Sequence, residues 1–411
     1  MGFDARELTP TAVLKITVTA AETRSFERAE KVLAEVGELA VSAKTIERVV
    51  HDVGRELGQR RDGDGRSEEA LAQRPAEPPE LAVVECDGGR IRTREPGHGP
   101  GVHGSGEGWR ETKNACLIRG QGRTFAEDPQ PEPPECFSDP EHVAKLAETE
   151  ALSVASPLAG EPNPAEPSAE QAEAAVEDWR PKRLVRTVLS SVADSRAFGR
   201  QVAREAKRRR FSEAKAKAFL GDGLPWNWSI WKQHFADFTP ILDFIHVLSY
   251  LWVVAKAIYT QAEEAWSQYV VWMRGCWRGE VEEVLEELRA WEGRLGVGSP
   301  EAGEEDPRRV VAKTIAYLEN NRDRMKYPEY RRKGLPITTA WMESLVKEMN
   351  YRVKGTEMFW NDPEGAEAIL QVRAAALCDD DRLVKYLKTR PGYPFTRRPR
   401  PPLLPDRTCK S

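Results

Sequence analysis

Short apolar runs alternate with amphipathic segments along this chain of 411 residues. The run Leu81–Cys86 is rich in β-branched and apolar residues, continues through Arg90–Arg94 and is expected to pair with Arg110–Ile118. Two further runs, Lys215–Leu220 and Pro240–Phe244, have the length and composition of buried strands. Because helical patterns separate these runs, the chain is predicted to be an α/β protein.

The first 60 residues have the pattern of a small helical unit, covering residues 10–57. Phe26–Val36 predicts a short helix, Gly37 a turn, and Ser42 the N-cap of a second helix. The second helix has one apolar stripe, formed by Ile46, Val49, Val50, Val53 and Leu57. This is the outline of a helix-turn-helix, in which Lys44 and Arg48, with His51, would face DNA. The alternative is a helical hairpin with a purely structural role.

Helical spacing returns in the second half of the chain. Residues 182–210 and nearly all of residues 246–335 are predicted to be helical, and Trp341, Leu345 and Met349 recur at helical spacing around Glu343. The most apolar stretch, Ile241–Tyr259, contains Asp243, His246 and Lys256, which leaves an uncharged run too short to span a bilayer. We therefore interpret it as a buried strand that leads into a core helix.

Charge is unevenly distributed, although the net charge of the chain is only −5. Residues 126–178 are acidic and rich in proline, which is typical of a linker. Residues 180–217 carry 13 Lys or Arg against 3 Asp or Glu, and the tail 388–411 carries 7 against 1. Basic segments of this kind favour a nucleic-acid partner, and the densest run is Lys207, Arg208, Arg209 and Arg210. A solvated helix face is the alternative for each of them.

The cysteine spacing argues against a zinc site, and the setting of a glycine motif argues against a dinucleotide-binding site. The six cysteines form no C-x-x-C pair, which argues against a zinc ribbon and favours reduced thiols in a cytoplasm. Gly99, Gly101 and Gly104 match G-x-G-x-x-G, but a strand rather than a helix follows, so a hairpin connection is favoured over a dinucleotide site. His98 and His103 in the same loop have no carboxylate or Cys at ligand spacing.

Three carboxylates have settings that suit divalent-metal chemistry. Asp87 and Asp222 each close an apolar, β-rich run, and Glu343 lies on the helical segment described above. Mg²⁺ prefers hard oxygen ligands and engages phosphate directly, so two strand-end aspartates and one helix-borne glutamate fit a site for two Mg²⁺ or Mn²⁺ ions. The alternative is that they are three of the 66 acidic residues with no shared role.

The surrounding sequence resembles a known family. Between Leu81 and Leu387 the chain resembles, in four ordered segments, the bacterial insertion-sequence DDE transposases, most closely the Kra group. The segments are GDGLPWNW, ILDFIHVLSYLW, YLENNRDRMKYPEYRRKGLPI and FWNDPEGAEAILQVRAAAL. The resemblance implies a ribonuclease-H-like catalytic core in which Asp87, Asp222 and Glu343 are metal ligands. It also implies cutting and joining of DNA at element ends and target, by a homo-oligomer assembled on DNA in the bacterial cytoplasm and nucleoid, with no membrane partner.

The identity of the second metal ligand and of the residues that support the site is open to alternatives. Asp243 is the rival of Asp222 for the second ligand position; we prefer Asp222 because a glycine on either side lets a phosphate approach. Asp243, His246 and Lys347 are then predicted to support the site. Family members commonly have a Gly-Ser-Gly-like run before the glutamate, where this chain has Thr338–Trp341, and many extend further at the N-terminus.

The sequence thus predicts a ribonuclease-H-like core with an N-terminal helix-turn-helix-like unit and an all-α insertion. The expected divisions are a helical DNA-binding unit 1–60, a linker 61–80, the first core part 81–125, an acidic linker 126–178, the second core part 179–246, a helical insertion 247–335, the glutamate helix and C-terminal helices 336–387, and a basic tail 388–411. The predicted function is DNA transposition by two-metal phosphoryl transfer. The alternatives are a truncated or inactive derivative that binds DNA without cutting, a metal-dependent nuclease that does not join ends, and a structural interaction protein.

Overall fold

A computed structural model describes residues 8–63, 77–93, 109–155, 179–296, 303–354 and 359–390, and for residues 109 and 148–155 only the backbone. Three features expected from the sequence lie outside these ranges: the glycine-rich loop with His98 and His103, most of the linker 61–80, and the tail beyond residue 390.

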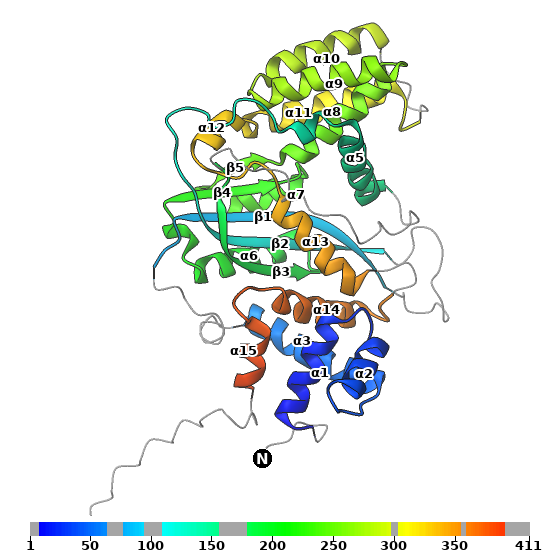
Figure 1. Cartoon of the computed structure of the whole chain (residues 1–411), viewed down its shortest axis with the longest axis vertical. Coiled ribbons are helices and arrows are strands. Elements are labelled where there is room, and N and C mark those ends of the chain that lie inside the picture. Colours follow the sequence, from blue (N-terminus) through cyan, green and yellow to red (C-terminus); the bar gives the residue numbers. More distant parts are fainter. Residues whose placement is uncertain are drawn as a thin grey trace, which may run out of the picture.

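A five-stranded sheet forms the centre of the molecule, in the order β3-β2-β1-β4-β5 (Figure 1). Its strands are β1 (Leu81–Arg92), β2 (Trp109–Gln121), β3 (Lys182–Ser191), β4 (Ala216–Gly221) and β5 (Thr239–Leu242). The pairs β1–β2 and β2–β3 are antiparallel, whereas β1–β4 and β4–β5 are parallel. The fold is therefore mixed α/β, as the alternation of apolar runs and helical segments predicts.

Helices cover both faces of the sheet. One face packs α6 (Ser195–Arg208) and α7 (Pro225–His234), because Ala82, Val84 and Cys86 of β1 share a hydrophobic cluster with the apolar residues of these helices. Leu81 and Val83 point to the opposite face, which packs α13 (Ala340–Val353) and α14 (Pro363–Ala376). Strand alternation places Glu85 and Asp87 on this second face as well.

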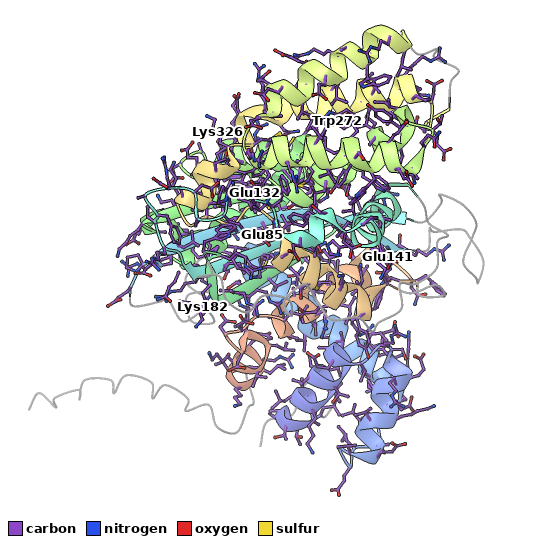
Figure 2. The ribbon with its side chains drawn as sticks, turned by 45° about the horizontal axis from the view of Figure 1, so that its top comes forward. Glu85, Glu132, Glu141, Lys182, Trp272 and Lys326 are labelled. Atoms are coloured by element: carbon purple, nitrogen blue, oxygen red, sulfur yellow. The ribbon has the colours of Figure 1, made fainter. Side chains whose placement is uncertain are left out.

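A bundle of helices extends from the end of β5 (Figure 1). It comprises α8 (Phe244–Ile258), α9 (Ala262–Trp277), α10 (Val281–Leu295), α11 (Pro307–Asn321), the short 3-10 helix η4 (Arg322–Arg324) and α12 (Tyr327–Arg332). Trp272 and Trp277 of α9 are buried, so these two side chains belong to the core (Figure 2). Within the described ranges, no helix combines the length and the apolar character needed to cross a bilayer.

The helices at the two ends of the chain pack together. They are α1 (Pro10–Glu22), α2 (Phe26–Glu35) and α3 (Ala43–Asp62) from the N-terminal part, with α14 and α15 (Arg382–Thr389). Ser42 caps α3 by accepting a hydrogen bond from the Thr45 N–H, as the sequence predicts. A Cβ atom at Gly54 would lie 2.1 Å from the carbonyl oxygen of Ala368, so α3 and α14 cross in close backbone contact.

Two buried arginines tie α1 to the C-terminal helices. The Arg352 Nε of α13 donates to the carbonyl of Ala20 at 2.7 Å, and the Arg373 Nη1 of α14 donates to that of Ala21 at 3.0 Å. Both carbonyls lie in the last turn of α1, where cations satisfy orphan acceptors and oppose the negative end of the helix dipole.

The predicted helix over residues 182–210 is wrong in its first half. Residues 182–191 form β3, and the helix α6 begins only at Ser195 after the N-cap Asp194. The stretch Val185–Leu189 is rich in β-branched residues, which favour a strand. The basic residues of β3 do not argue against a strand, because their long side chains can reach solvent or a partner from either type of element.

Part of the acidic stretch 126–178 is also ordered. It contains η1 (Glu135–Ser138) and α5 (Pro140–Ala155), and Phe137 and Val143 are buried. Phe137 packs against Phe244 and Trp277, with ring centroids 5.7 and 6.1 Å apart. The ion pair of Asp128 with the buried Arg331 also holds this segment, so tertiary contacts fix a stretch whose composition is that of a linker. Residues 156–178 lie outside the described ranges.

Candidate metal and phosphate site

The parallel pairing of β1 with β4 brings two predicted ligands together at the point where this pairing ends. Asp222 follows the last residue of β4, as predicted, but Asp87 does not close its strand, because β1 stays paired with β2 as far as Arg92. Cys86 pairs with Gly221 in the sheet register, so Asp87 and Asp222 follow at adjacent positions on strands about 4.8 Å apart. Burial raises the pKa of the Cys86 thiol, and the charges of Asp87 and Asp222 raise it further. Both carboxylates therefore lie close to this one thiol.

Asp222 forms a turn that begins α7. Its Oδ1 accepts hydrogen bonds from the Leu224 N–H at 2.9 Å and from Nδ2 of the buried Asn227 at 2.5 Å. Gly223 has a φ of +100°, a conformation that favours glycine. The turn keeps Asp222 half-buried at the strand end, where a phosphate could approach it.

Asp243 has different neighbours. It is fully buried, caps α8 and accepts four hydrogen bonds. Its Oδ1 accepts from the N–H groups of Ile245 at 3.3 Å and Thr339 at 3.0 Å. Its Oδ2 accepts from the Thr339 hydroxyl at 3.0 Å and contacts Nδ1 of the half-buried His246 at 2.6 Å. The carboxylate is thus enclosed by hydrogen-bonding groups of the protein.

Glu343 lies in the first turn of α13, which packs on β1 and β2. Its N–H donates to the carbonyl of Thr339 at 2.9 Å, so the bonds of Thr339 to Asp243 also fix the start of this helix. Glu348 lies further along the same helix. Arg186 of β3 donates to its two carboxylate oxygens through both terminal nitrogens, at 2.8 and 2.9 Å. Lys347 is exposed on the same helix.

Glu85 is an acidic group that the sequence analysis missed. It is fully buried in the middle of β1, two residues before Asp87 and on the same face (Figure 2). Burial raises the pKa of Glu85 well above its usual value, and the charges of Asp243 and Glu343 add to the shift, although the Met342 N–H opposes it. Neither oxygen accepts a well-formed hydrogen bond from a described residue. The available signal was an acid inside an otherwise apolar strand.

The structure brings the acids of the sequence prediction to one region but not into a closed ligand set. Asp87 and Asp222 are adjacent, and Glu343 is close enough to Glu85 to influence its pKa. Among the residues that the structure describes, no three His, Cys, Asp or Glu side chains gather closely enough to hold an ion between them. The donor chemistry nevertheless suits Mg²⁺ or Mn²⁺, because carboxylate oxygens are the hard ligands that these ions prefer.

The basic residues predicted to bind DNA have two kinds of environment. Lys44 and Arg48 are exposed on α3, one turn apart and opposite its buried stripe, and Lys44 pairs with Glu47 at 2.6 Å. Lys207 is also exposed, at the end of α6.

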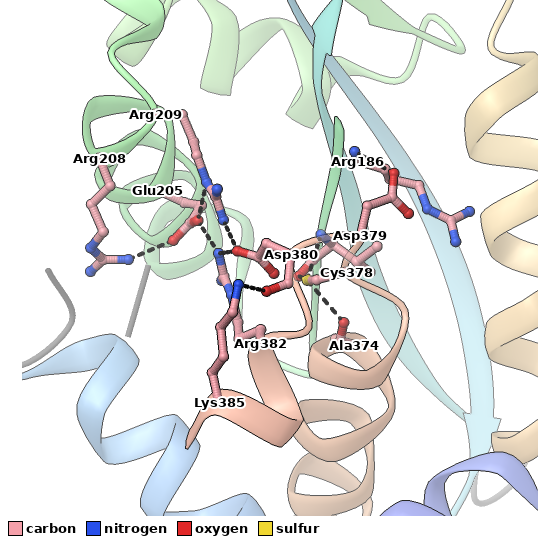
Figure 3. A network of polar contacts seen from close by, with 11 residues as sticks. Arg186, Glu205, Arg208, Arg209, Ala374, Cys378, Asp379, Asp380, Arg382 and Lys385 are labelled. Atoms are coloured by element: carbon pink, nitrogen blue, oxygen red, sulfur yellow. Dashed lines mark hydrogen bonds and ion pairs between the residues drawn. The ribbon is translucent and has the colours of Figure 1, made fainter. Parts of the chain in front are cut away.

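The three arginines after Lys207 take part in ion pairs within the protein. Arg208 and Arg209 bind the buried Glu205, and Arg209 also binds Asp380 at 2.6 Å (Figure 3). Arg210 binds Glu213 at 2.6 Å. Arg382 joins the same network from α15 through Glu205 and Asp380. The run that the sequence favours as a nucleic-acid contact is therefore engaged within the protein, by Glu205 and Glu213 close in sequence and by Asp380 far along the chain.

Comparisons with known proteins find matches among solved structures but none among family models or curated sequences. No family model matches the chain, and no curated protein sequence matches it, so no sequence match supports the Kra-group resemblance. Among solved structures, the chain is similar to the Drosophila P element transposase strand transfer complex, with a TM-score of 0.33 and 9% sequence identity over 92% of this chain and 93% of that chain. A likeness of this degree assigns neither activity nor substrate to the chain.

Proposed function

We propose that the chain is a DNA transposase of the DDE type, with a ribonuclease-H-like catalytic core. The observation that carries the proposal is the placement of Asp87 and Asp222 at neighbouring positions on β1 and after β4, where the parallel pairing of the two strands ends. The sheet order β3-β2-β1-β4-β5, with three antiparallel strands followed by two parallel ones, supports the proposed core. So does Glu343, which lies on the helix that covers the same face of the sheet.

Asp87, Asp222 and Glu343 would hold two Mg²⁺ or Mn²⁺ ions. Bound there, the ions would supply a nucleophile at neutral pH and offset charge on the phosphate. The proposal requires that ion binding draw Glu343 to the aspartates. The Asp222 turn keeps that carboxylate at the strand end, while Asp243, His246 and Thr339 fix the start of the glutamate helix.

DNA is the proposed partner, bound as element ends and as target, with the protein assembling as a homo-oligomer on it. The exposed pair Lys44 and Arg48 on α3 is the proposed contact to phosphate. Replacing both with Ala should weaken DNA binding for every sequence and flatten the slope of log K against log salt by about 2, because about two fewer counterions are released. Binding titrations at several salt concentrations test this, with the exposed Lys313 of α11 changed to Ala as the control. An unchanged slope would remove α3 from the interface.

The function itself is tested with the purified full chain and labelled duplex DNA from the two flanks of its coding region. We expect cleavage with Mg²⁺ or Mn²⁺, none with EDTA, and joining of the released 3′ ends to a target plasmid. Cleavage without joining would favour the metal-dependent nuclease. DNA binding without either reaction would favour the inactive derivative, and the absence of both binding and cleavage would contradict the proposal.

A further inference from the structure

The helical bundle between β5 and α13 contacts the turn that carries Asp222. Tyr317 of α11 donates its hydroxyl hydrogen to the backbone carbonyl of Asp222 at 2.9 Å. Tyr317 and Asp222 are 95 residues apart in the sequence, so this is a tertiary contact of the bundle with the strand end. No local pattern around Asp222 predicts it.

The ring of Tyr317 is fixed on both sides. On one side it packs on Gly223, where a Cβ atom would lie 2.6 Å from Cε2 of the tyrosine. On the other side it stacks on Tyr250 of α8, with ring centroids 3.8 Å apart and an interplanar angle of 6°. Gly223 is therefore required both for its positive φ and for room beside the ring.

Two other tyrosines of the bundle make the same type of bond to β5. Tyr327 donates to the carbonyl of Leu242 at 3.1 Å, and Tyr330 donates to that of Pro240 at 3.3 Å. Burial raises the pKa of Tyr317 above its usual value and that of Tyr330 to about 12, so both remain protonated donors at neutral pH. Tyr317 differs because its acceptor belongs to a proposed metal ligand.

We propose that Tyr317 is a positioning residue that holds Asp222 in its ligand geometry and thereby makes the active site depend on the helical bundle. The proposal rests on the function proposed above. Without the hydroxyl, the backbone of Asp222 loses its hydrogen bond to α11, and the Asp222 carboxylate loses part of its fixed orientation. Removing a group that orients a metal ligand typically costs about 10- to 100-fold in metal affinity or activity.

The test compares Tyr317→Phe with Tyr330→Phe in the full chain. Each change removes one hydroxyl that donates to a backbone carbonyl. For Tyr317 this carbonyl is that of Asp222, whereas for Tyr330 it is that of Pro240. Three quantities are measured: the Kd for Mn²⁺ by calorimetry, hydrogen exchange of the Leu224 amide, and the melting temperature. The Leu224 amide reports the turn directly, because it donates to the Asp222 carboxylate.

We expect Tyr317→Phe to weaken Mn²⁺ binding about 10-fold and to speed exchange at Leu224, with a fall in melting temperature similar to that of Tyr330→Phe. In DNA cleavage, kcat should fall while KM for DNA stays unchanged. Equal Mn²⁺ affinity and equal Leu224 exchange in the two variants would overturn the proposal. If the wild type neither binds Mn²⁺ nor cuts DNA, the proposed function fails, and Leu224 exchange still decides whether Tyr317 holds the turn.

Discussion

At the scale of single residues, Asp222 and Asp243 show how two similar strand-end acids acquire different properties. Asp243 accepts hydrogen bonds from groups on α8 and before α13, so its charge is stabilised by the protein itself. Asp222 lies half-buried in a turn between two glycines. A buried carboxylate with four partners is suited to hold elements together, whereas a half-buried one at the strand end can exchange water for an ion.

Gly54 allows a single-residue test of how the N-terminal helices join the rest of the molecule. Gly54→Ala places a Cβ against the Ala368 carbonyl, which is backbone and cannot rotate away, so we expect a loss of about 1–3 kcal/mol in the free energy of unfolding. The control is Gly58→Ala, one turn later, where the nearest atom is 3.8 Å away. This change should stabilise the helix by about 0.5–1 kcal/mol. Thermal melting of both variants tests the account, and equal effects would contradict the close crossing.

At the scale of elements, α13 is held at its start and in its middle. Thr339 bonds to Asp243 where the helix begins, and the Arg186–Glu348 pair anchors its middle to β3. Burial would raise the pKa of Glu348, but the hydrogen bonds and charge of Arg186 outweigh it and lower the pKa. The position of Glu343 is thus set by residues that do not belong to the triad.

Thr339 provides the test of this anchoring. Thr339→Val keeps the shape but leaves Asp243 short of one donor, so we expect a loss of about 1–3 kcal/mol in stability and a lower rate of DNA cleavage. Thr339→Ser keeps the hydroxyl and should retain most of the stability and most of the rate of DNA cleavage. Melting and cleavage assays on the two variants measure the effect. Wild-type cleavage by Thr339→Val would show that the start of α13 does not depend on this bond.

The sequence could predict those elements whose signals are local. The strand end before Asp222, the helix at Glu343 and the Ser42 cap follow from alternation, helical spacing and capping chemistry. The predicted strand end at Asp87 is wrong, because pairing with β2 carries β1 on to Arg92. The pairs of Glu205 with Arg208 and Arg209 have local helical spacing, but the bonds of Asp380 to Arg209 and of Arg382 to Glu205 join residues more than 170 positions apart. No local pattern contains these two distant bonds. Glu85 has a local signal, as an acid inside an apolar strand, but no local pattern places it near Asp243 and Glu343.

At the scale of the whole molecule, buried ion pairs connect α6 to the C-terminal helices (Figure 3). Burial by itself would raise the pKa of Glu205, but the charges of Arg382 and Arg209 outweigh it and hold the pKa below its usual value. A carboxylate with a lowered pKa stabilises the folded state above its unfolded-state pKa. That contribution is lost as the pH falls through the folded-state pKa.

Glu205→Gln should therefore destabilise the protein at pH 7 by about 3 kcal/mol, because it leaves Arg209 and Arg382 with one buried partner fewer. The difference in the free energy of unfolding between Glu205→Gln and the wild type should shrink as the pH is lowered below the usual pKa of a glutamate. Denaturant unfolding at pH 7 and at acidic pH measures both values. A pH-independent difference would show that Glu205 acts through packing and not through its charge.

The placement of the second ligand is the central claim for the molecule as a whole, and Asp222→Asn beside Asp243→Asn tests it most directly. Cleavage of labelled flanking DNA with Mg²⁺ is measured for each purified variant, together with its melting temperature. Asp222→Asn should lose cleavage by orders of magnitude while its DNA binding and melting temperature stay close to wild type, because it removes one anionic ligand oxygen. Asp243→Asn should lose about 1–3 kcal/mol of stability, with activity falling only as folded protein is lost. Normal cutting by Asp222→Asn, or a stable but inactive Asp243→Asn, would contradict the account and move the second ligand to Asp243.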